Sequence, residues 1–134
     1  LKKHTGQTKL KFKKNNIIEL LKQNENNIYF NEHSSRNNPL DELEFTIKLN
    51  MENKTKYHEF KNIINNINFK SKLPSCRCMI CKNNDENRNL LKEIYNMQLK
   101  YEFRRDQNVV QYVFFKEKCE YKLCFFPSWD YLNE

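Results

Sequence analysis

The sequence predicts a small α+β domain with about three helices, a C-terminal three-stranded antiparallel meander and one further strand. The chain has 134 residues, which is the usual size of a single domain. Its apolar residues recur at helical spacing in some segments and alternate with polar residues in others. Its 5 cysteines fall into two groups, and a zinc ion shared by both groups is expected to staple the fold.

The first half of the domain is expected to hold one helix and one strand. Asn15 or Asn16 is a suitable N-cap for a short helix that runs to about Gln23. Residues 24–38 are mostly polar and predict a loop that ends in an Asn-Pro turn. Strict alternation of apolar and polar residues over 42–50 then predicts a half-buried strand.

The second half is expected to hold two helices and the meander. Apolar residues at helical spacing predict a helix from about Lys54, and a third helix is expected over residues 85–96. The period then changes, because apolar and polar residues alternate over 97–103. Residues 109–116 and 121–126 are expected to add two more strands. Short turns between the three strands predict an antiparallel meander.

Positive charge is concentrated at the start of the chain. Residues 1–14 contain no acidic residue and the following lysines: Lys2, Lys3, Lys9, Lys11, Lys13 and Lys14. The whole chain has a formal net charge of +7, so residues 15–134 are close to neutral. We therefore expect residues 1–14 to form a basic N-terminal arm and residues 15–134 to form one α+β domain.

Two pairs of cysteines have a spacing that suits a structural zinc site. They are Cys78-x-x-Cys81 and Cys119-x4-Cys124, and Cys76 is an alternate ligand in the first group. Four thiolates from two chain segments complete the tetrahedral coordination of zinc and leave no open position for a reactive water. Zinc is therefore expected as a structural cofactor, not a catalytic one.

Two other states of the cysteines stay open. Small secreted domains often depend on disulfides, and a bridge between Cys119 and Cys124 would close the last predicted hairpin. An odd number of cysteines would leave one thiol unpaired. The third possibility is that the thiols are simply buried and inert.

A second basic stretch surrounds the first cysteine group. It contains no acidic residue and carries Lys70, Lys72, Arg77 and Lys82. Together with the N-terminal arm, these side chains are candidates for contacts with phosphates, where each contact releases counterions. The expected partner is a nucleic acid, RNA rather than DNA, or a larger ribonucleoprotein assembly.

The composition argues against an enzyme. Gly6 is the only glycine, whereas phosphate-binding loops and nucleophile elbows need several. No segment combines a recognisable nucleophile, base and charge-stabilising group. No apolar run approaches the roughly 20 residues that cross a bilayer. We therefore expect no small-molecule substrate and no membrane insertion.

Two functional hypotheses follow. The leading one is a non-enzymatic, zinc-stabilised basic protein that binds RNA or DNA inside the cell, for example as a component of a ribonucleoprotein or an organellar ribosome. The alternative is a secreted or exported protein-binding module held by disulfides, in which the acidic segment 41–59 and the meander face the partner. The abundance of Asn and Lys with no Ala is typical of an A+T-rich genome and bears on neither hypothesis.

Overall fold

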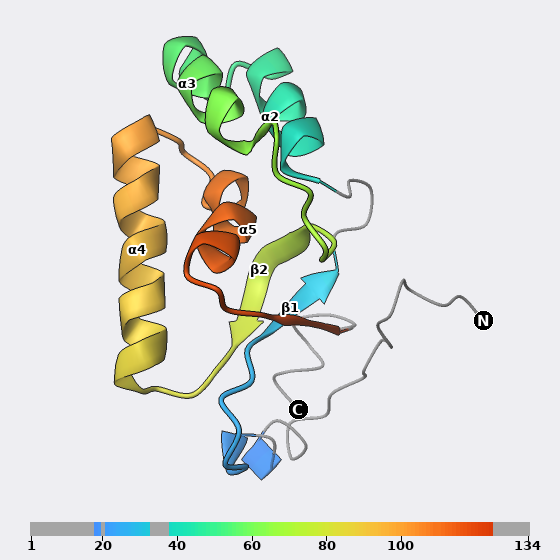
Figure 1. The fold of residues 1–134 in the computed structure, drawn as a ribbon, viewed down its shortest axis with the longest axis vertical. Helices are drawn as coiled ribbons and strands as arrows, with labels where there is room; N and C mark the ends of the chain where they lie inside the picture. Colours follow the sequence, from blue (N-terminus) through green and yellow to red (C-terminus); the bar gives the residue numbers. More distant parts are fainter. Residues whose placement is uncertain (1–17, 20, 33–37, 125–134) are drawn as a thin grey trace, which may run out of the picture.

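The computed structural model describes residues 18–19, 21–32 and 38–124, and within them the chain is a small α+β domain (Figure 1). Its elements are β1 (Tyr29–Glu32), α2 (Pro39–Lys48), α3 (Lys54–Ile64), β2 (Pro74–Ile80), α4 (Asp85–Tyr101), α5 (Gln107–Lys116) and β3 (Lys122–Cys124). The expected α+β class is therefore confirmed. The predicted N-terminal arm lies outside the described residues, as do residues 15–17 and 20 of the helix predicted to end at Gln23, of which residues 18–19 and 21 are helical.

The strands form one mixed sheet with the order β2-β1-β3 among the described residues. The central strand β1 runs antiparallel to β2, with Tyr29 opposite Ile80. It runs parallel to β3, with Tyr29 opposite Lys122 on the other side. The pairing with β2 is irregular after Phe30, where the register shifts. Strands from the start, middle and end of the described chain thus lie side by side.

The predicted C-terminal meander is wrong. Residues 97–101 continue α4, residues 109–116 belong to α5, and of the predicted last strand the described part pairs as β3. The alternating pattern after residue 96 was misleading because it includes Leu99, which is 60% exposed. Met97 and Tyr101 are buried and continue the helical spacing of Leu90 and Ile94, so they belong to the buried face of one long helix.

The strand predicted over residues 42–50 is also wrong, because this segment is the helix α2. Asn38 caps it, with its side-chain oxygen accepting a hydrogen bond of 3.0 Å from the backbone N–H of Asp41. Pro39 occupies the first turn, where its missing N–H costs nothing. The Asn-Pro pair therefore starts a helix here, and it does not end a loop.

Two predicted helices are confirmed. The helix α3 starts at Lys54, and Asn53 caps it through the backbone N–H of Lys56. The helix α4 starts at Asp85, and the side chain of Asn84 accepts a hydrogen bond from the N–H of Asn87. The loop predicted over residues 24–38 needs correction because it contains β1, and Cys76 and Cys78 of the first cysteine group lie in the strand β2.

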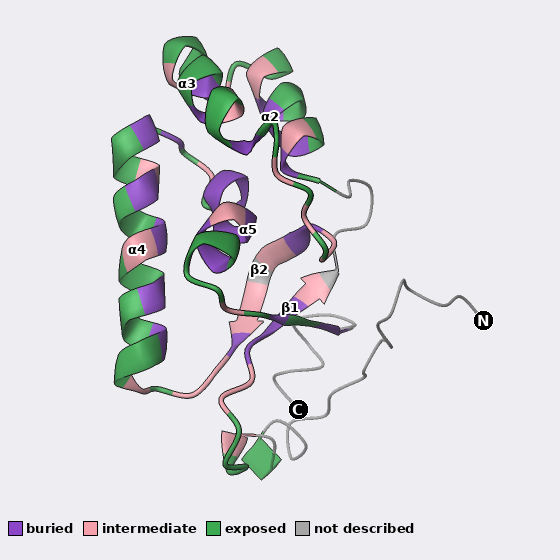
Figure 2. Cartoon of the chain, viewed as in Figure 1, coloured by how far each residue is buried: buried purple, intermediate pink, exposed green. Residues whose placement is uncertain are grey.

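The core lies between the helices and one face of the sheet, where buried positions gather (Figure 2). Phe30 from β1 meets Phe114 of α5 edge to face, with ring centroids 5.7 Å apart. Phe60 of α3 is fully buried and contacts rings from α4 and α5, including Tyr101. Aromatic side chains therefore join the helices to each other and to the sheet.

Candidate binding site

The predicted zinc site is wrong, because the cysteines do not converge. The described residues, which include all five cysteines, contain no group of three or more His, Cys, Asp or Glu side chains able to hold a metal ion. The zinc-binding expectation for Cys78, Cys81, Cys119 and Cys124, with Cys76 as alternate ligand, is therefore overturned.

The first cysteine group separates where β2 is irregular. Cys76 and Cys78 are two residues apart, which in a regular strand gives one face, but they fall at the register shift against β1. Cys76 packs against the main core under the helices, whereas Cys78 packs on the opposite face of the sheet near Tyr29 and Cys124. The second pair also divides, because Cys119 contacts the main core. Cys78 and Cys124 lie close together on the face near Tyr29, but they are only two ligands, and among the described residues no third His, Cys, Asp or Glu side chain completes a metal site with them.

All five cysteines are unpaired thiols in the structure. The disulfide expected between Cys119 and Cys124 is therefore absent, and the hairpin that it would close does not form. Burial raises the pKa of every one of these thiols, and for Cys124 it raises the pKa to about 12, with the nearby Cys78 adding to the shift. The neutral thiol form therefore dominates at neutral pH.

Thiol chemistry gives a direct check of this arrangement. In denaturant without reductant, we expect five thiols per chain to react with a colorimetric disulfide reagent. In the folded protein at neutral pH, they should all react more slowly than a model thiol, since the thiolate is the nucleophile and each pKa is raised. The rates should rise with pH towards those raised pKa values. A count of one or three thiols would instead show disulfides.

The described residues give no support for RNA binding. Lys70 is exposed and Lys72 is half-buried, while the ammonium group of Lys82 donates to the backbone oxygen of Gln23. The side chain of Arg77 and all the lysines of residues 1–14 lie outside the described part of the structure. Basic and acidic side chains are almost equally numerous across the described residues.

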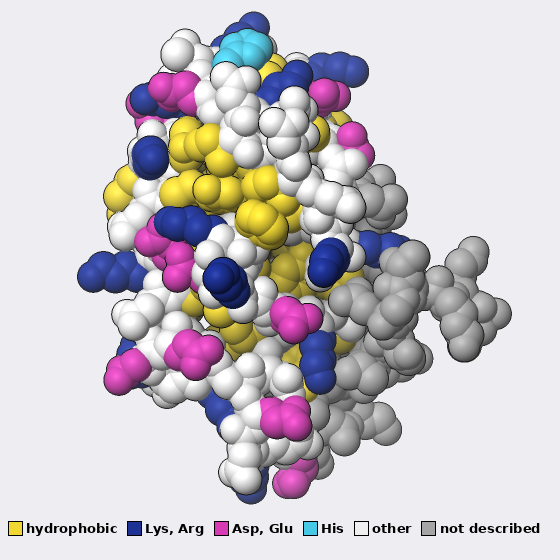
Figure 3. Space-filling view, in the orientation of Figure 1, with side chains coloured by type: hydrophobic (Ala, Val, Ile, Leu, Met, Phe, Trp, Pro, Cys, Tyr) yellow, Lys and Arg dark blue, Asp and Glu magenta, His cyan; other side chains and the backbone are white. Residues whose placement is uncertain are grey.

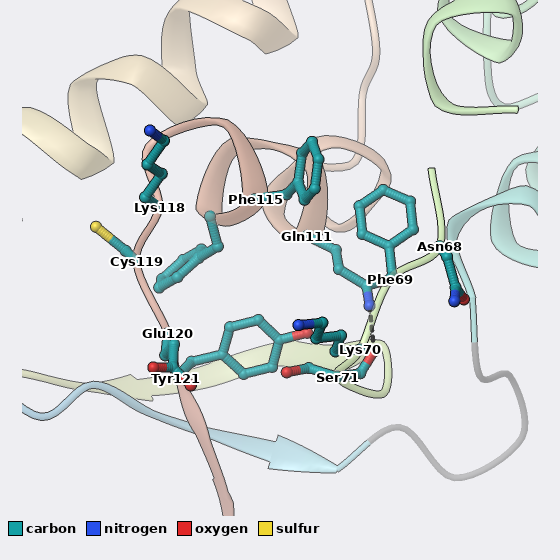
Figure 4. A pocket seen from close by; sticks show the side chains of 11 residues that line it. Asn68, Phe69, Lys70, Ser71, Gln111, Phe115, Lys118, Cys119, Glu120 and Tyr121 are labelled. Carbon is teal, nitrogen blue, oxygen red and sulfur yellow. Dashed lines mark hydrogen bonds between the residues drawn. The ribbon is translucent and has the colours of Figure 1, made fainter. Parts of the chain in front are cut away.

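A pocket of about 380 Å³ opens between α5, the loop after α3 and the segment that leads into β3 (Figure 4). We call it the α5 pocket. Its lining residues are Asn68, Phe69, Lys70, Ser71, Gln111, Phe114, Phe115, Lys118, Cys119, Glu120 and Tyr121. Two stretches that are distant in sequence, 68–71 and 111–121, therefore contribute to one cavity.

Aromatic rings form the walls of the α5 pocket. Phe69 from the loop meets Phe115 of α5 edge to face, with ring centroids 5.7 Å apart. Phe115 is 52% exposed even though it follows the buried Phe114. Tyr121 is buried, and its hydroxyl donates a hydrogen bond of 2.6 Å to the backbone oxygen of Lys72. Burial raises the pKa of this hydroxyl, so it stays a neutral donor.

The side-chain amide of Gln111 is a buried polar group within these apolar walls. Gln111 is buried, and its Nε2 donates to the backbone oxygen of Ser71 (Figure 4). Its Oε1 is also buried and has no hydrogen-bond partner among the described residues. A buried acceptor without a partner costs free energy.

The rim of the α5 pocket carries charge of both signs. Lys70 and Lys118 are exposed at the rim, together with Glu120. On the face seen in Figure 3, hydrophobic side chains gather near the middle, between Lys or Arg side chains. Nearby, Lys116 is paired with Glu93 at 2.6 Å. The pocket can therefore hold an apolar or aromatic group and attract an anionic group beside it, with carboxylates limiting how much negative charge it tolerates.

No protein-family model matches the chain, no curated protein matches its sequence and no solved structure matches its fold. Function therefore has to follow from the chemistry of the site itself. None of the described helices is long and apolar enough to span a membrane.

The sequence did not predict the α5 pocket. Residues 109–116 were assigned to a strand, which places the neighbours Phe114 and Phe115 on opposite faces of a sheet. In α5 they share a helix that is buried on most sides, and Phe115 is the ring that stays exposed. A run of ten residues with apolar positions in every direction indicates a buried helix as readily as a strand. Two adjacent phenylalanines in such a run were the one available signal.

Proposed function

We propose that the protein is a non-enzymatic binding module whose α5 pocket receives an apolar or aromatic side chain of a protein partner. The observation that carries this proposal is the half-exposed Phe115, paired with Phe69 at the mouth of a cavity of about 380 Å³. Large aromatic side chains at such positions are the usual anchors of protein interfaces.

The charges at the rim suggest what surrounds the anchor. Lys70 and Lys118 flank the pocket, so an acidic residue next to the anchor would meet a lysine. The expected ligand is therefore a peptide segment with a large apolar side chain close to an acidic one.

The same charges favour a protein over a nucleic acid at this pocket. A stacked base would also suit Phe115, but the rim offers only Lys70 and Lys118 as cations, with Glu120 beside them. That charge suits a single acid of a peptide better than a repeating phosphate backbone. The pocket itself holds no histidine among its lining residues and its thiol, Cys119, has a pKa raised by burial, which supports binding rather than catalysis.

The test is a selection from a displayed library of short random peptides, followed by fluorescence anisotropy with the recovered peptides. We expect an enriched motif of a large apolar residue beside Asp or Glu. Phe115→Ala should weaken binding about tenfold or more, which corresponds to about 1.4 kcal/mol. Lys118→Glu should weaken binding of the acidic peptides and reduce its dependence on salt.

A matched control is Phe45→Ala, because Phe45 is an exposed phenylalanine on α2, away from the α5 pocket. It should leave peptide affinity unchanged. The proposal fails if no peptide is enriched, or if Phe45→Ala and Phe115→Ala have equal effects. Tight binding of a single-stranded oligonucleotide that depends on Phe115 would show that the pocket serves a nucleic acid instead.

A further inference from the structure

The helix α4 carries an exposed apolar stripe on the side that faces away from the core. The stripe consists of Leu91, Tyr95 and Leu99, which are 44%, 59% and 60% exposed. They recur every four residues, whereas the buried positions of the same helix lie on another side (Figure 2). None of the three lines the α5 pocket, so the stripe is a separate surface.

The stripe is symmetric about its central residue. Leu91 and Leu99 lie four positions before and after Tyr95, on the same side of the helix. If two copies of α4 pack antiparallel around a two-fold axis at Tyr95, each Leu91 meets the Leu99 of the other copy. A two-fold interface requires this self-complementary arrangement, because the same patch serves both subunits.

The charges at the two ends of the stripe are complementary in the same arrangement. Arg88 lies seven positions before Tyr95 and Glu102 lies seven positions after it. In the antiparallel pair, each Arg88 therefore faces a Glu102 of the other copy. Arg88 is exposed and forms an ion pair with the exposed Asp85 of its own chain. An exposed ion pair contributes little free energy, so replacing it with a pair across the dimer costs little. Glu102 is also exposed, with a 3.3 Å hydrogen bond from Asn53.

We propose that this stripe is a homodimer interface, in which α4 packs antiparallel against α4 of a second copy of the chain. The span from Arg88 to Glu102 is 14 steps along the chain, or about 21 Å, and ends at Glu102, the left-handed C-cap that directly follows α4. A single pair of helices buries a small interface, so the dimer should be weak and should depend on protein concentration. Each copy keeps its α5 pocket open, so a dimer would present two equal binding sites.

Sedimentation velocity over a series of protein concentrations tests the proposal. We expect the wild-type protein to shift from monomer to dimer as concentration rises. Leu99→Asp should raise the dissociation constant about tenfold or more, because it places a charge in the apolar contact. Leu49→Asp is the matched control, since Leu49 is an equally exposed leucine at the end of α2.

A charge exchange tests the antiparallel pairing itself. Arg88→Glu alone and Glu102→Arg alone should each weaken the dimer, because like charges then face each other. The double variant Arg88→Glu with Glu102→Arg should recover dimerisation, since the two-fold axis pairs the exchanged residues again. Circular dichroism of each variant establishes that it is folded. A wild-type protein that stays monomeric at all concentrations, or a double variant that is no better than the single ones, would overturn the proposal.

Discussion

Replacing Phe60 with alanine should lower the free energy of unfolding by about 4 kcal/mol, the usual cost of deleting a buried phenylalanine ring. Phe60 is fully buried in α3, and its ring meets Tyr101, Phe103 and Tyr112 at centroid distances of 5.0, 5.4 and 5.6 Å. Those three rings come from α4, the segment after it and α5. The cavity would therefore open at the point where three parts of the chain meet, and neighbouring side chains could fill little of it.

Urea unfolding followed by circular dichroism measures this loss. Phe115→Ala is the matched control, because it removes the same ring from a position that is half exposed. It should cost about 1 kcal/mol or less, since much of its surface already contacts water. Equal losses for the two variants would show that α3 does not pack on α4 and α5 as described.

Replacing Glu52 with alanine should lower the free energy of unfolding by about 2–3 kcal/mol. Glu52 lies in the chain segment between α2 and α3 and is buried, and both oxygens of its carboxylate accept hydrogen bonds. Its Oε1 accepts a hydrogen bond of 2.7 Å from the backbone N–H of Arg104, and its Oε2 accepts one from Nδ2 of the buried Asn108. Alanine would leave both donors without this acceptor, and Asn108 would keep only a long contact of 3.5 Å to Thr46.

Two further variants separate the hydrogen bonds from the general effect of removing a charge. Glu52→Gln keeps one acceptor oxygen, so it should lose less stability than Glu52→Ala. Glu59→Ala removes a carboxylate that is 52% exposed and pairs with Lys56 across one helical turn. That change should stay within about 0.5 kcal/mol. A Glu52→Ala variant no less stable than Glu59→Ala would contradict the buried network.

Local signals in the sequence predicted α3 and α4 well because their caps act within a few residues. Asn53 and Asn84 each accept a backbone N–H of the first turn, and that preference does not depend on the rest of the fold. The same kind of signal was present at Asn38-Pro39 and was read as a turn. The alternation of residues 42–50 outweighed it, although Phe45 and Leu49, two members of the apolar set, are exposed on α2.

The strands and the site were harder to predict because they depend on distant partners. A strand is stable only where it meets a neighbour, and β1 meets β2 and β3 from elsewhere in the chain. The cysteine spacing suggested zinc only if Cys76, Cys78 and Cys81 lay in a loop. Cys76 and Cys78 instead lie at the register shift in β2 and pack in different clusters, and Cys81 follows the strand, which no spacing rule could reveal. Binding of RNA or DNA through residues 1–14 stays a prediction, as does an intracellular location.

The parallel pairing of β1 with β3 has a consequence for how the protein is made. Phe30 lies beside Leu123 in the sheet, so the central strand gains its second neighbour only when almost all of the described chain exists. During synthesis, β1 and β2 can pair first and leave one side of β1 open to other chains. The long separation between the partners also slows folding, since a large loop must close before the contact forms. A nascent chain that stops before Lys122 should therefore recruit chaperones or aggregate.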